Sequence, residues 1–315
     1  MGKLAKKSTR KKLSVLVATL FALSMLVTLI FAVPMAGADE PLIVSLDYPS
    51  AYTDDKTTNQ VDKIMSFDYA GNSLTPDQLE ILAKNSELAA KRAEKDVKFL
   101  TDNAEKQMND SMKSDKAPDV GILTVSIPIG QDTTIYNCEV GNKGGSRSGA
   151  SDWAAQYSTS GKWSDVSTWC VAVGSSNAWA WVGPRVYISG SGSKSANIIF
   201  RGRYYGGIFG GFGGSSNGRI RVSIYDYTLG SEMGGLTLWD RTASNGQRIM
   251  ASDPSFSNAV QLTLQAGHTY AFRFGDTVSS AQYSLPYPDL SNTDFWNNGP
   301  GGDGLDASSV TVDFF

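Results

Sequence analysis

The sequence predicts a mainly β protein: an antiparallel β-sandwich of jelly-roll or immunoglobulin-like outline, preceded by a signal segment and a long N-terminal α-helix. Three observations predict this fold class. The composition changes near Pro118, with three Gly and no Trp before it but 29 Gly and all seven Trp after it. Beyond Pro118 no segment keeps a helical spacing of apolar residues for more than two turns. Several segments instead alternate polar and apolar residues, as strands with one solvent-exposed face do. Eight or nine such segments over 198 residues are typical of a sandwich.

The first 38 residues have the layout of a secretory signal. Residues 1–12 hold six Lys or Arg, residues 13–33 carry no charge, and Ala36-Gly37-Ala38 is a small-residue cleavage pattern. We therefore predict a signal peptide over residues 1–38. The uncharged run is also long enough to cross a bilayer, so an uncleaved N-terminal anchor is the alternative. Both possibilities predict an exported protein, either secreted or held at the cell surface.

A long helix is expected after an extended linker, with a short helix, over residues 39–74. Thr75-Pro76-Asp77-Gln78 combines an N-cap, a proline at the first helical position and the two ends of a capping box. No Gly or Pro interrupts residues 79–113, so the sequence predicts an amphipathic helix over residues 75–116. Its narrow, Ala-rich apolar stripe favours packing against the following domain or a stalk; self-association through this helix is the alternative.

Residues 118–315 are predicted to form the Gly- and Trp-rich sandwich domain. Runs rich in β-branched and aromatic residues lie between turn signals, and Arg219–Ile224 places apolar residues on one face only. Upstream, the strand-like run Leu42–Leu46 could add to the sheet edge of a second copy, which would make the protein a self-assembling structural subunit. The predicted strands of the domain are Val120–Ile127, Trp169–Val173, Ala178–Ile188, Asn197–Tyr205, Gly218–Tyr227, Leu236–Arg241, Val260–Leu264, Thr269–Gly275 and Val310–Phe315.

The two cysteines, Cys138 and Cys170, lie in the same Gly- and Trp-rich region. An even number of cysteines in an exported protein predicts one disulfide bond. Two buried free thiols are the alternative. Neither state makes them catalytic, because His268 is the one histidine of the chain and lies far along the sequence from both.

Five aromatic residues are the predicted ligand contacts. Trp153, Trp163 and Trp296 lie in polar surroundings, where an aromatic ring is more easily exposed than in an apolar run. Tyr204 and Tyr205 open a stretch in which Gly doublets alternate with bulky side chains. Exposed rings of this kind suit stacking on the sugars of a surface glycan.

Two further aromatic features have a structural and a functional interpretation. The Gly-rich stretch 203–214 is either an exposed aromatic loop or a place where glycine lets neighbouring chains approach closely, and we favour the second. Trp179 and Trp181 share one face if they lie on a strand. Core packing is favoured over a sugar-stacking surface for this pair.

The segment 297–306 is rich in oxygen ligands that suit Ca²⁺. The candidate ligands are Asp303 and Asp306, together with Asp294. The glycine–aspartate pattern of calcium β-rolls occurs once and lacks its large apolar residue, so a β-roll is rejected. A possible structural Ca²⁺ is therefore predicted, with a solvated turn as the alternative, and no other cofactor is expected.

Charge and composition argue against two classes of function. Without residues 1–38 the chain has 22 basic and 31 acidic residues and no basic cluster, so nucleic acid is not an expected partner. One His and two Cys argue against a Cys/His zinc site and most histidine-based catalysis. We predict no enzymatic activity. The alternative is a secreted hydrolase that uses an Asp pair drawn from Asp152, Asp165, Asp226 and Asp240.

The stretch Leu264–Phe272 resembles strand pairs in secreted β-sandwich accessory domains, including pre-peptidase-type and carbohydrate-binding modules. That resemblance implies a non-catalytic extracellular module and says nothing about its ligand. The sequence therefore predicts an exported, non-enzymatic binding or adhesion module for a surface glycan or a matrix or envelope component.

Overall fold

A computed structural model of the chain describes residues 75–114, 124–283, 290–296 and 304–315. The described residues confirm a mainly β protein with one long helix. Within them, no helix has the length and apolar character needed to cross a membrane. The predicted signal segment, the linker and the run Leu42–Leu46 lie outside the described residues and stay predictions. The elements are α3 (Pro76–Ser114), β1 (Val125–Pro128), β2 (Thr133–Ile135), β3 (Val140–Ser158), β4 (Trp163–Gly183), β5 (Arg185–Ser189), β6 (Ser193–Gly210), β7 (Gly214–Asp226), β8 (Ser231–Ser244), β9 (Gln247–Gln265), β10 (Thr269–Gln282), β11 (Leu290–Phe295) and β12 (Gly304–Phe314).

Helix α3 begins with the capping box that its sequence predicts. The Gln78 backbone N–H donates to Thr75 Oγ1 at 3.3 Å, and the Thr75 N–H donates to Gln78 Oε1 at 2.8 Å. Pro76 takes the first helical position, where its missing N–H costs nothing. The apolar stripe is buried against the sheet; its positions are Ala93, Val97, Leu100, Ala104, Met108 and Met112.

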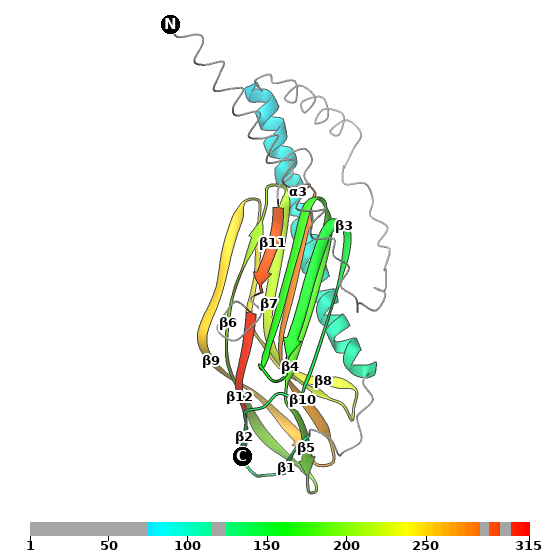
Figure 1. The fold of residues 1–315 in the computed structure, drawn as a ribbon, viewed down its shortest axis with the longest axis vertical. Coiled ribbons are helices and arrows are strands. Elements are labelled where there is room, and N and C mark those ends of the chain that lie inside the picture. The colour runs from blue at the N-terminus through cyan, green and yellow to red at the C-terminus, as the bar shows by residue number, and fades with distance from the viewer. Residues whose placement is uncertain (1–74, 115–123, 284–289, 297–303) are drawn as a thin grey trace. The chain divides into compact units, whose positions relative to one another are not determined.

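The twelve strands form one hydrogen-bonded network, antiparallel except for the pair β1–β5. Strand β4 belongs to two layers. Its residues 174–182 pair with β10, whereas residues 166–171 pair with β11 and residues 163–164 with β12. We call β3, β4, β10, β7 and β8 the first layer, and the part containing β11, β6, β9, β12 and β2 the second layer (Figure 1). A jelly-roll or immunoglobulin-like strand order stays a prediction.

The two layers face each other across a core that is apolar over most of its length. The rings of Phe200 on β6 and Phe274 on β10, strands that are not paired, lie 5.3 Å apart edge to face. In another part of the core, Ser and Thr side chains take the place of apolar ones. Thr168 Oγ1 lies 2.8 Å from Ser280 Oγ across the interior, and Ser280 Oγ lies 3.0 Å from Ser216 Oγ. These buried groups satisfy one another, so polar residues are accommodated inside the protein.

Helix α3 covers the outer face of the first layer (Figure 1). Trp179 and Trp181 are buried there with Met108, so core packing is the correct interpretation, although the helix rather than the other layer supplies the partner. Ion pairs also join helix α3 to strand β7 of the first layer. Glu105 Oε2 accepts from Arg219 Nη1 at 2.8 Å, and Glu105 Oε1 accepts from Arg221.

The predicted disulfide between Cys138 and Cys170 is wrong, because both thiols are free. Cys138 precedes Glu139, whose N–H donates to the carbonyl of Gly183 at one end of β4. Cys170 lies on the same strand, thirteen residues before Gly183, which corresponds to roughly 40 Å of extended chain. A disulfide needs Cα atoms within about 7 Å.

Candidate binding groove on the second layer

The strand register gathers a set of aromatic and polar side chains on the outer face of the second layer, the side that points away from the core. Residues directly opposite each other in antiparallel strands share a face. Residues 151–158 of β3 pair with the part of β4 that belongs to the second layer, so two neighbouring rows run across β3, β4, β11, β6 and β9. The first row is Asp152, Trp169, Asn292, Phe209 and Arg248, and the second is Ala154, Ser167, Asp294, Gly207 and Met250.

A groove of about 350 Å³ lies over the β11, β6 and β9 part of these rows. Its floor is β6, and its two sides are formed by β11 and β9. Met250 and Asp294 are exposed, whereas Phe209 is half-buried. The groove thus combines an aromatic ring, a thioether, one cation, one carboxylate and one amide; its lining residues are Gly206, Gly207, Ile208, Phe209, Arg248, Met250, Asn292 and Asp294.

Two adjacent glycines create the hollow and the packing beneath it. Gly207 points outward, and a Cβ there would reach the Met250 Sδ at 3.1 Å, so a side chain would fill the groove. Gly206 points inward, and a Cβ there would lie 2.6 Å from Cε1 of the buried Phe295 ring. The Gly-rich stretch is therefore part of a strand up to Gly210, and close packing is the correct interpretation for its inward glycines.

The five predicted ligand contacts do not gather in one place. Tyr205 is exposed on the outer face of β6, two residues from Gly207, and Trp163 lies opposite Asp306 on the same side of the layer. Tyr204 points the other way and is buried against Phe256, with ring centroids 6.1 Å apart.

The remaining two predicted contacts are tryptophans outside the groove. Trp153 packs against the core with its ring over Gly145, so it is not an outer-face contact. Trp296 follows β11 and is half-buried.

The candidate calcium ligands are not brought together. Asp294 pairs in register with Gly207 and Asp306 with Arg203, four residues apart along β6, a separation of roughly 13 Å. The Asp306 carboxylate accepts from Arg203 Nε at 2.7 Å. Asp303 lies outside the described residues, within which no cluster of three metal-ligating side chains occurs. The calcium site stays a prediction.

The carboxylates proposed as a hydrolase pair have other contacts. Asp152 pairs with Arg147 and Asp240 with Arg219, at 2.8 and 2.9 Å. Asp226 Oδ2 lies 2.7 Å from His268 Nδ1 at the end of β7. Asp165 is buried and accepts from Gln156. None of these four residues lines the groove.

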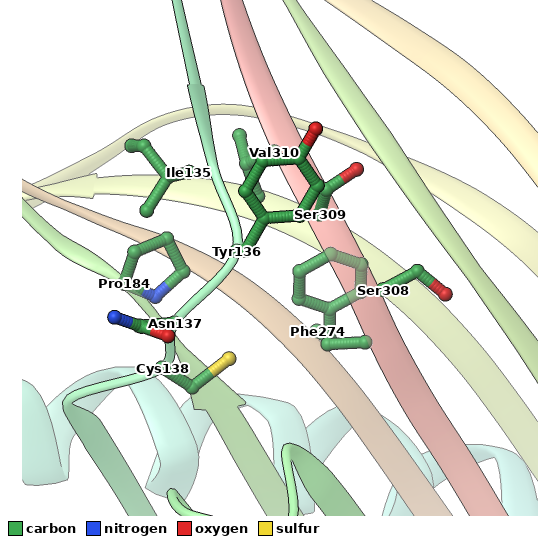
Figure 2. Close-up of a pocket in the computed structure, with 10 residues that line it drawn as sticks. Ile135, Tyr136, Asn137, Cys138, Pro184, Phe274, Ser308, Ser309 and Val310 are labelled. Carbon is green, nitrogen blue, oxygen red and sulfur yellow. The ribbon is translucent and has the colours of Figure 1, made fainter.

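A second, smaller hollow lies beside Cys138, and Figure 2 shows the residues that line it. Ile135, Tyr136, Pro184 and Phe274 surround it, and the space is too tight to admit a water molecule. Burial raises the pKa of the Cys138 thiol to about 12, so this sulfur is protonated at neutral pH and is a poor nucleophile.

The sequence did not predict the groove residues other than Asp294. Phe209 lies within the Gly-rich stretch, but Arg248 and Asn292 are 39 and 83 residues further along the chain. The one usable signal was the alternation Tyr205, Gly207, Phe209, which places these three on one face of a strand.

No protein-family model matches the sequence, and no curated protein matches it. Among solved structures, the isomalto-dextranase of Arthrobacter globiformis T6 is 10% identical over 52% of this chain and 23% of its own length, with a TM-score of 0.17. The glycoside hydrolase domain of Endo-D from Streptococcus pneumoniae R6 is 8% identical over 54% of this chain and 21% of its own, at a TM-score of 0.18.

A family 11 carbohydrate-binding module from Clostridium thermocellum is 14% identical over 58% of this chain and 92% of its own, at a TM-score of 0.17. The chain spans less than a quarter of the length of the first two of these proteins. At TM-scores this low, the likenesses assign neither a fold family nor a ligand.

Proposed function

We propose that this protein is an exported, non-enzymatic binding module that holds a glycan in the groove on the outer face of its second layer. The observation that supports the proposal is the row Trp169, Asn292, Phe209 and Arg248, which crosses four adjacent strands. A pyranose ring has an apolar C–H face and a rim of hydroxyl groups. An aromatic ring packs on such a face, and amide, carboxylate and guanidinium groups bond to such a rim.

The spacing of the row suits an extended polymer better than a single sugar. Trp169 and Phe209 are separated by two strand spacings, which is roughly 10 Å and comparable to the length of a disaccharide. The backbone that carries the two rings is held in the sheet, so little ordering is needed on binding.

The proposal is tested by measuring binding of the purified full chain to a panel of soluble and insoluble glycans and to native envelope or matrix material. Phe209→Ala removes the aromatic floor of the groove and should weaken binding at least about tenfold, as loss of a central aromatic contact does. Tyr136→Ala is the matched control, because Tyr136 is a 65% exposed aromatic residue that does not line the groove.

Equal binding by both variants and the unmodified chain would show that the groove is not the binding surface. Failure to retain any glycan would contradict the proposed function itself. A self-assembling subunit remains the second candidate, and its strand Leu42–Leu46 lies outside the described residues. Deletion of residues 39–58 should abolish polymers if that mechanism operates.

A further inference from the structure

The cation of the groove, Arg248, forms no ion pair with the residues that the structure describes. Asp152 and Asp306, two acidic residues of the outer face, are paired with Arg147 and Arg203. Asp294, the carboxylate of the groove, lies on β11, on the opposite side of β6 from Arg248 and in the neighbouring row. The side chain of Arg248, by contrast, is exposed, lines the groove and makes no hydrogen bond or ion pair with any residue that the structure describes.

Arg248 also lies beside the aromatic floor. It is directly opposite Phe209 in the β6–β9 register, where Cβ atoms are about 5 Å apart. A pyranose packed on Phe209 would therefore carry its exocyclic group within reach of the Arg248 guanidinium. If that group is a carboxylate, the planar guanidinium fork can donate two parallel hydrogen bonds to it.

We propose that the ligand is an acidic glycan built from uronic acids, and that Arg248 is the residue that selects its carboxylate. This inference rests on the proposed function of the same groove. The whole chain has a formal net charge of −3, so it does not attract a polyanion by its overall field. Recognition of the acidic sugar must then come from the local contact, and it should weaken when salt screens that contact.

The test uses three uronic-acid polymers, each beside its carboxyl-reduced form, which keeps the same sugar backbone without the charge. Binding of the full chain is measured by titration calorimetry for the unmodified protein, Arg248→Gln and Lys143→Gln. Lys143 is an exposed cation on β3 outside the groove, so its variant controls for the loss of one positive charge.

The expected result is that at least one polymer binds about tenfold more tightly in its acidic form, and that Arg248→Gln abolishes this difference. Lys143→Gln should keep it. Acidic and reduced forms that bind equally well, or an Arg248→Gln variant that keeps the preference, would overturn the inference and leave glycan binding intact. If neither form of any polymer binds and no neutral glycan binds either, both this inference and the proposed function are contradicted.

Discussion

The neighbouring glycines Gly206 and Gly207 allow the packing and the binding surface to be tested separately, because they point to opposite faces of β6. A Cβ at position 206 would lie 2.6 Å from Cε1 and from Cγ of Phe295, where about 3.5–4.0 Å is normal. The ring is fully buried and packs on Trp239 at a centroid distance of 5.7 Å. It therefore has little freedom to move away.

We expect Gly206→Ala to destabilise the protein by about 1–3 kcal/mol, the usual cost of overpacking a core. At roughly 2–4 °C per kcal/mol for a domain of this size, Tm should fall by about 2–12 °C. At position 207 the nearest atom is the flexible Met250 Sδ, so Gly207→Val should change stability by less than about 0.5 kcal/mol. That side chain fills the groove, and glycan binding should weaken at least about tenfold.

The assay is thermal unfolding followed by circular dichroism, together with glycan titration, on both variants. A Gly206→Ala variant that melts at the temperature of the unmodified chain would show that residue 206 does not face Phe295. A folded Gly207→Val variant that binds glycan normally would remove the groove from consideration. The pair therefore tests the strand register and the binding surface independently.

Three further outcomes are expected. Glu105→Gln removes one of the three carboxylates paired with Arg219 and one of the two paired with Arg221, and it should cost about 1–3 kcal/mol in thermal unfolding. Glu94→Gln, which breaks an exposed pair with Lys98, should cost less than about 1 kcal/mol, and equal effects would show that Glu105 does not join the helix to the sheet. Burial raises the pKa of Asp276 well above its ordinary value of 3.8, so folding favours the protonated acid. The contribution of this residue to stability should therefore be greatest below pH 3.8 and be lost as the pH rises from there through its raised pKa in the folded protein. Asp276→Asn should flatten this fall, and parallel pH profiles would refute the assignment. Because both thiols are free, dithiothreitol should leave Tm unchanged, and a drop in Tm would reveal a disulfide.

The helix could be predicted from sequence in detail because its signals are local. The reciprocal Thr75–Gln78 bonds involve residues three apart, and the apolar stripe repeats at helical spacing. The predicted strands on β6, β7, β8, β9, β10 and β12 are in place but too short. Trp169–Val173 and the start of Ala178–Ile188 belong to one strand, β4, and the end of Ala178–Ile188 belongs to β5, whereas β2, β3 and β11 were not predicted. Gly- and Ser-rich segments, such as β3 and the Ser175–Asn177 part of β4, lack the apolar alternation that identifies a strand.

The hydroxyl-lined part of the core explains that failure. Thr168, Ser216 and Ser280 are buried, yet each belongs to a different strand, and their bonds join residues 112 and 64 positions apart. Nothing local marks such a residue as interior. The groove was missed for the same reason, since its sides come from strands that are distant in sequence. The disulfide was inferred from cysteine number, which carries no information about the length of strand between the two residues.

The shared strand β4 and the position of β12 have a consequence for the order in which the molecule can form. Strand β12 pairs with β2, β4 and β6, so it connects segments made much earlier during synthesis. Until residues 304–314 have left the ribosome, β2 and one side of β6 lack their hydrogen-bonding partner. Pairing over such long sequence distances makes folding slow. The nascent chain must therefore wait with open strand edges, and a chaperone that binds extended segments would act in that interval.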